Sequence, residues 1–122
     1  MSVLVIGNEE TIRNLDKYKG NLAALTDPRK TTEAQAQQLI KTSKPIYWIT
    51  SGMHSPERGG PQMLMELAYR LVVEETPFIQ NIRNNVITLI TPVIEAVLLL
   101  VTVRLPAVPP LTVKVFCEPF PV

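Results

Sequence analysis

Residues 46–73, IYWITSGMHSPERGGPQMLMELAYRLVV, decide how the chain is expected to fold. Ile46 to Thr50 is rich in β-branched and aromatic residues, which predicts a strand. After Gly59-Gly60, Pro61 suits the first position of a helix. Apolar residues then recur at helical spacing and predict one buried stripe, in which the methionine is core: Met63, Leu64, Leu67, Ala68, Leu71 and Val72. The stretch therefore predicts a strand, a loop that carries the histidine, and a helix.

The segment before this stretch predicts another strand and two helices. Val3 to Ile6 is an apolar, β-branched run, and Gly7-Asn8 with the acidic pair after it suits a strand that leads into a capped helix. That helix should end near Asp27-Pro28, because proline disfavours helical geometry in the residue before it. Its predicted buried face is Ile12, Leu15, Leu22 and Leu25. Thr32-Glu33-Ala34-Gln35 fits a capping box, which predicts a short second helix through Ile40.

The segment after it predicts a short helix and a third strand. Thr76-Pro77 begins a helix that carries Phe78, Ile79 and Ile82, and Val86 to Thr91 returns to strand. The order of elements predicts an α/β fold: a partial layered sandwich with a largely parallel or mixed sheet flanked by helices. Residues 105–122 hold five of the eleven prolines, so a helix cannot persist there and any strand must lie at an edge. An irregular or disordered tail is predicted.

Composition favours one domain and argues against several partners. The chain has 122 residues and 12 basic against 11 acidic side chains, which are scattered, so no nucleic-acid partner is expected. The apolar stretch at the amino terminus is too short for a signal peptide, and the location is left open. A single cysteine, Cys117, cannot form an internal disulfide. Val86 to Val103 is the longest apolar region, but Pro92 and Glu95 argue against a membrane span, since a buried Glu costs about 2.5–3.5 kcal/mol.

The only histidine, His54, lies three residues before a carboxylate, Glu57. Such a pair is often just an exposed imidazole with an ordinary hydrogen bond. The context favours a ligand-binding role for the pair, because ligands of open α/β sheets bind beyond the carboxyl ends of strands. Nearby glycines also let the loop bend both side chains towards one point. The helical zinc signatures HExxH and HxxEH are absent, so the pattern is HxxE on a loop.

The stretch from Tyr47 to Ile90 resembles the first metal-binding segment of the zinc carboxypeptidases of the carboxypeptidase A type. In that family a strand leads into G-x-H-x-x-E, a helix follows, and the next strand ends at Asn-Pro. The resemblance covers about residues 1–95 and implies that His54 and Glu57 are two of three protein ligands of one catalytic Zn²⁺. It also implies that the complete form hydrolyses the carboxy-terminal bonds of peptide or protein substrates with zinc-activated water.

Departures from the family pattern are as clear as the match. The sequence has no second histidine, and neither the late catalytic glutamate nor the Asn-Arg and tyrosine substrate-binding residues can be placed, so catalytic and substrate-binding residues are not identified. Pro56 stands where many members have arginine, and Thr91-Pro92 stands where they have Asn-Pro. Residues 96–122, apolar and then proline-rich, resemble nothing in the family. We therefore expect a truncated or frame-shifted reading of a longer peptidase gene.

Three hypotheses follow from the sequence. The first is a metallocarboxypeptidase-like domain over residues 1–95, inactive in this chain alone because a zinc ligand, a base and a substrate clamp are missing. For these roles only Glu95, Arg58 and Arg83 are at hand, and none stands at a family catalytic position. The second is a catalytically inactive binding module that keeps the loop for structure. The third is a membrane-anchored fragment that uses Val86 to Val103.

Overall fold

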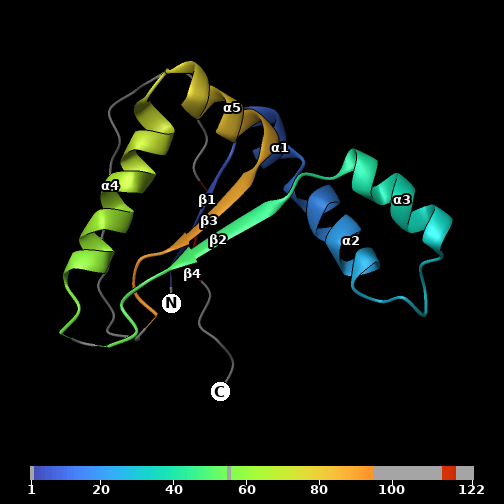
Figure 1. Ribbon diagram of the computed structural model, residues 1–122, viewed down its shortest axis with the longest axis horizontal. Coiled ribbons are helices and arrows are strands. Elements are labelled where there is room, and N and C mark those ends of the chain that lie inside the picture. Colours follow the sequence, from blue (N-terminus) through green and yellow to red (C-terminus); the bar gives the residue numbers. More distant parts are fainter. Residues whose placement is uncertain (1, 55, 95–113, 118–122) are drawn as a thin grey trace.

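The computed structural model describes residues 2–54, 56–94 and 114–117, which form an α/β fold (Figure 1). The elements, in chain order, are β1 (Ser2–Ile6), α1 (Glu9–Arg13), α2 (Leu15–Leu25), α3 (Glu33–Thr42), β2 (Ile46–Thr50), α4 (Gly59–Val73), α5 (Pro77–Asn85), β3 (Ile87–Thr91) and β4 (Lys114–Cys117). The predicted strand, loop and helix of residues 46–73 are therefore confirmed as β2, a connecting loop and α4.

The four strands form one mixed sheet in the order β2-β3-β1-β4. Strands β2 and β3 pair in parallel, from Ile46 opposite Ile87 to Thr50 opposite Thr91. Strand β1 pairs antiparallel with β3 and with β4. Of the two sheet types predicted, largely parallel or mixed, the mixed one is correct. Strand β1 runs antiparallel to β3, whereas β2 runs parallel to it.

Strand β4 lies at an edge of the sheet, the position predicted for any strand of the proline-rich tail. Its four residues contain no proline, so every backbone N–H is available for pairing. The prediction of an irregular tail is wrong for these residues. For residues 105–113 and 118–122 the prediction lies outside the described part of the chain.

Helices cover both faces of the sheet, which makes it the layered sandwich predicted. One core cluster joins α4 and α5 to Ile6 and Ile90, and the other joins α1 and α2 to Val5 and Ile87. Neighbouring strand residues such as Val5 and Ile6 point to opposite faces, so β1 and β3 each contribute to both clusters. Figure 1 shows α4 on one side of the strands and the pair α2 and α3 on the other.

The predicted first helix is two helices, α1 and α2, which meet at Asn14. Asn8 caps α1 as predicted, because its side chain accepts from the Thr11 backbone N–H at 2.8 Å. The Asn14 side chain donates to the Glu10 carbonyl at 2.9 Å and so competes with a continuous helix. The new direction of α2 leaves Leu22 36% exposed, whereas Ile12 and Leu15 are buried as predicted.

The apolar stripe of α4 is confirmed apart from its first residue. Leu64, Ala68, Leu71 and Val72 are buried, but Met63 is 55% exposed, because it projects from the helix away from the sheet. Helix α4 also begins two residues before Pro61, at Gly59. The predicted helix that begins at Thr76-Pro77 and carries Phe78, Ile79 and Ile82 is confirmed as α5, in which Ile79 is buried and Phe78 is 72% exposed.

The capping box at Thr32 is confirmed in both directions. The Gln35 backbone N–H donates to the Thr32 hydroxyl, and the Gln35 side chain accepts from the Thr32 N–H at 2.9 Å. Helix α3 contacts α2 but buries none of its side chains. The Asn21 side chain ties α2 to Ser43 just after α3, so these helices form a hairpin beside the sheet.

Across the described residues, no helix is long and apolar enough to cross a membrane. Part of the apolar region considered for a span, Ile87–Thr91, is the strand β3. The remainder of that region from residue 95 onwards lies outside the described residues.

Candidate metal centre

The loop that carries His54 begins at the carboxyl end of β2 and is fixed to the neighbouring strand. The Ser51 backbone N–H donates to the Thr91 carbonyl, and the Ser51 carbonyl accepts from the Ile94 N–H, both at 3.1 Å. In Figure 1 the chain leaves the arrowhead of β2 and turns back into α4. The loop therefore lies where an open α/β sheet presents its ligand sites, as the sequence predicts.

Gly52 has the one positive φ angle found in the described residues, +64°. A Cβ atom at this position would lie 3.0 Å from the Val93 Cα and 3.1 Å from the Pro92 carbonyl oxygen. Both the backbone angle and the available space therefore require glycine. This close approach holds the start of the loop against the segment that follows β3.

His54 and Glu57 lie at the two ends of one tight turn. The Glu57 backbone N–H donates to the His54 carbonyl at 3.0 Å, which closes the turn. Both side chains are exposed, so each is free of the desolvation cost that a buried, unpaired ionisable group would carry. An imidazole and a carboxylate are both ordinary zinc ligands, and the turn places them on one segment of the loop.

A full set of metal ligands is not present in the described part of the chain. No group of three His, Cys, Asp or Glu residues there could hold a metal ion together. By residue type, His54 and Glu57 offer an imidazole and a carboxylate, two of the donor groups that zinc takes in proteins. Glu95, considered from the sequence as a further carboxylate, lies outside the described residues.

Arg83, one of two cations considered as a substrate clamp, has a structural role at the end of α4. It is 6% exposed, and its guanidinium donates to the Leu71 and Val72 carbonyls at 3.2 and 2.9 Å and to the Glu75 carboxylate at 2.9 Å. These bonds satisfy carbonyls at the end of α4, so Arg83 is not available to a substrate. Arg58 is exposed at the end of the loop, immediately before α4.

Thr91, which stands where the family has asparagine, is fully buried and bonded within the sheet. Its hydroxyl accepts a hydrogen bond from the Trp48 indole N–H at 2.9 Å. Sequence reasoning missed this contact, because it predicted the two strands that carry these residues but not their pairing. The bond ties β2 to β3 immediately before the loop, so it supports the loop rather than contributing a ligand.

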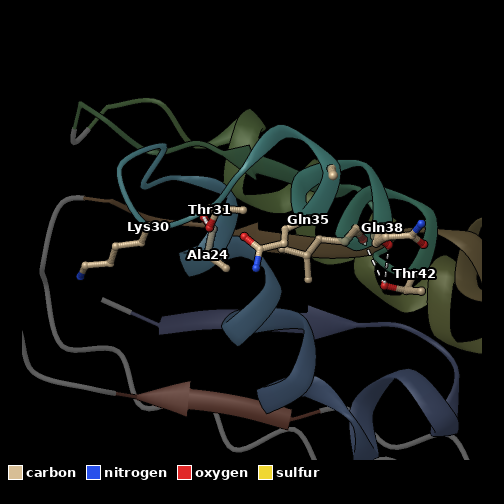
Figure 2. Close-up of a pocket in the computed structure, with 8 residues that line it drawn as sticks. Ala24, Lys30, Thr31, Gln35, Gln38 and Thr42 are labelled. Carbon is tan, nitrogen blue, oxygen red and sulfur yellow. Dashed lines mark hydrogen bonds between the residues drawn. The ribbon is translucent and has the colours of Figure 1, made fainter.

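A hollow between α2 and α3 is separate from the loop between β2 and α4. It has a volume of about 630 Å³ and is open to solvent (Figure 2). Its hydroxyls are used internally: Thr31 donates to the Ala24 carbonyl at 2.7 Å, and Thr42 donates to the Gln38 carbonyl at 3.2 Å. None of its lining residues comes from the loop between β2 and α4, so it is no part of the candidate centre.

Comparison with protein families decides the relationship. The family model for zinc carboxypeptidases matches residues 1–95. The chain belongs to the zinc carboxypeptidase family. Family members are zinc-dependent hydrolases, and the matched part of this zinc carboxypeptidase chain contains β1 to β3, all five helices and the loop with His54 and Glu57. No curated protein and no solved structure matches the chain at a significant level.

Proposed function

We propose that the loop between β2 and α4 binds Zn²⁺ through His54 and Glu57, as part of a metallocarboxypeptidase domain. The observation that carries this proposal is the family match over residues 1–95. The geometry supports it, because both residues belong to one turn beyond the carboxyl end of a parallel strand. In the complete form, the domain would hydrolyse the carboxy-terminal peptide bonds of peptide or protein substrates.

The roles of the two side chains follow from their chemistry. Bound zinc in such a site lowers the pKa of a water molecule and polarises the scissile carbonyl. In this chain the neutral imidazole of His54 and the carboxylate of Glu57 would hold the ion. Both must be deprotonated to bind, so zinc binding should release protons and should weaken in acid.

We infer that the 122-residue chain does not complete this site alone. Its sequence has one histidine, so a second imidazole ligand must come from elsewhere. Arg83 is occupied by the carbonyls of α4, which removes one of the two cations that might orient a substrate carboxylate. Zinc should therefore bind weakly, and hydrolysis should be below detection.

The second candidate is a binding module that keeps the loop without catalysis. The same single histidine favours it. The two proposals differ in metal binding, since a module that retains the loop only for structure has no need of a zinc that depends on both His54 and Glu57.

Zinc content after dialysis against a small excess of Zn²⁺ tests the proposal. The purified chain, the variants His54→Ala and Glu57→Gln, and the control Glu33→Gln would be compared by mass spectrometry of the metal. Glu33 is a matched control because it is an exposed carboxylate in the first turn of α3, away from the loop. We expect both loop variants to lose zinc and the control to keep it. Equal zinc content in all four proteins would refute the assignment.

A further inference from the structure

The two adjacent glycines at the start of α4 have very different surroundings. A Cβ atom at Gly60 would overlap the Ser51 hydroxyl oxygen and would lie 3.2 Å from the Ser51 Cβ. A Cβ atom at Gly59 would meet nothing within 4 Å. A side chain at position 60 would therefore require Ser51 to move, whereas position 59 would accept a side chain without any such change.

The close approach joins the two ends of the loop that carries His54 and Glu57. Ser51 is fixed at the start of the loop, because its N–H and its carbonyl are both bonded to the segment at the end of β3, and Gly52 beside it packs against Val93. Gly60 is the first fixed point after the loop, because it lies in the first turn of α4, one turn before the fully buried Leu64. The distance between these two points sets the shape available to the loop.

The loop itself offers little else that would fix the two side chains. The zinc signatures carried on a helix obtain their ligand geometry from the helix, but here the ligands lie on irregular backbone. The Glu57 N–H is bonded to the His54 carbonyl and the Arg58 N–H to the Pro56 carbonyl, and these backbone bonds leave the distance between Ser51 and α4 open. The approach of Gly60 to Ser51 is thus one of the constraints that the described residues place on the loop.

We propose that Gly60 is a positioning residue for the metal site: its missing side chain lets α4 begin against Ser51 and so holds His54 and Glu57 where both can reach one zinc ion. The inference rests on the proposed zinc site. Gly60 contacts no ligand atom and acts only through the loop. Supporting residues of this kind typically change metal affinity by about 10- to 100-fold when they are altered.

Four variants test the idea: Gly60→Ala, Gly59→Ala, Ser51→Ala, and the double variant Ser51→Ala/Gly60→Ala. Gly59→Ala is a matched control, because both glycine substitutions restrict the unfolded chain equally. Zn²⁺ affinity would be measured by competition with a chromophoric chelator, and Co²⁺ absorption would report the ligand geometry. Unfolding by urea without metal would report stability separately.

We expect Gly60→Ala to weaken Zn²⁺ binding by about tenfold or more and to change the Co²⁺ spectrum. Gly59→Ala should bind as the natural chain does. Removal of the Ser51 hydroxyl should restore much of the affinity in the double variant, because only the 3.2 Å contact with the Ser51 Cβ then remains.

The outcomes separate this inference from the proposal beneath it. If the natural chain binds Zn²⁺ in a His54-dependent way and Gly60→Ala binds it equally well, the positioning role is refuted and the zinc site stands. If Gly60→Ala lowers stability alone, with affinity and the Co²⁺ spectrum unchanged, the glycine serves packing only and the inference is wrong. If the natural chain shows no His54-dependent binding, the proposed function fails and the inference falls with it.

Discussion

Replacement of Gly52 by alanine should destabilise the fold clearly, because two independent features of the structure oppose a side chain there. The φ angle of +64° costs an L-residue about 1–2 kcal/mol. The new Cβ would also lie 3.0 Å from the Val93 Cα, a backbone atom that cannot rotate away. Overpacking of this kind costs about 1–3 kcal/mol.

A smaller effect acts in the opposite direction. Alanine restricts the unfolded chain and so favours folding by about 0.4–1 kcal/mol. The net loss expected for Gly52→Ala is therefore roughly 1–4.6 kcal/mol in the free energy of unfolding. Because the strain falls on the tie between the loop and the end of β3, zinc affinity should drop as well.

Urea unfolding followed by circular dichroism would measure the loss, with Gly20→Ala as the matched control. Gly20 lies inside α2, and a Cβ atom there would meet nothing within 4 Å. This control should stabilise the chain by about 0.8–1 kcal/mol, because alanine is the better helix former. Equal stability changes in the two variants would refute the reasoning about the loop.

Three further outcomes are expected. Arg83→Leu should cost about 2–4 kcal/mol of stability, because it leaves buried carbonyls of α4 unpaired. The control Arg70→Leu removes only exposed ion pairs and should cost under about 1 kcal/mol. Similar losses in the two variants would contradict the buried role of Arg83. Hydrogen bonds from the Gln80 amide and then from Arg83 hold the pKa of Glu75 below its ordinary 4.5, so Glu75→Gln should lower the free energy of unfolding near neutral pH. The difference in stability between variant and natural chain should shrink as acid protonates Glu75 through that lowered pKa. A stability difference that does not depend on pH would count against this. Peptide hydrolysis by the 122-residue chain should be undetectable, and turnover abolished by both a chelator and His54→Ala would show the site to be more complete than proposed.

Features fixed by neighbouring residues could be predicted from the sequence. The caps at Asn8 and Thr32 are local hydrogen bonds between residues three apart, so the residue types at those positions are enough to predict them. The buried stripe of α4 follows from helical spacing. The position of the His54 loop at a strand end followed from the same local patterns, since the strand and the helix beside it were both recognisable.

Features that depend on contacts distant in sequence could not be predicted. Arg83 is buried because α5 packs beside the end of α4, and nothing in its own segment indicates this. The exposure of Met63 depends on how α4 is rotated over the sheet, which spacing fixes only to within a residue. The different demands at Gly59 and Gly60 arise from Ser51, on the far side of the loop.

The most direct test of the account uses the fact that the sequence has a single histidine. The imidazole signals in a ¹H–¹⁵N NMR spectrum therefore report His54 alone, and a Zn²⁺ titration can follow them in the natural chain and in Glu57→Gln. We predict a saturable shift in the natural chain and binding at least about tenfold weaker in the variant, because one of the two ligands is lost. Imidazole signals that do not respond to Zn²⁺, or that respond equally in both proteins, would contradict a zinc site shared by His54 and Glu57.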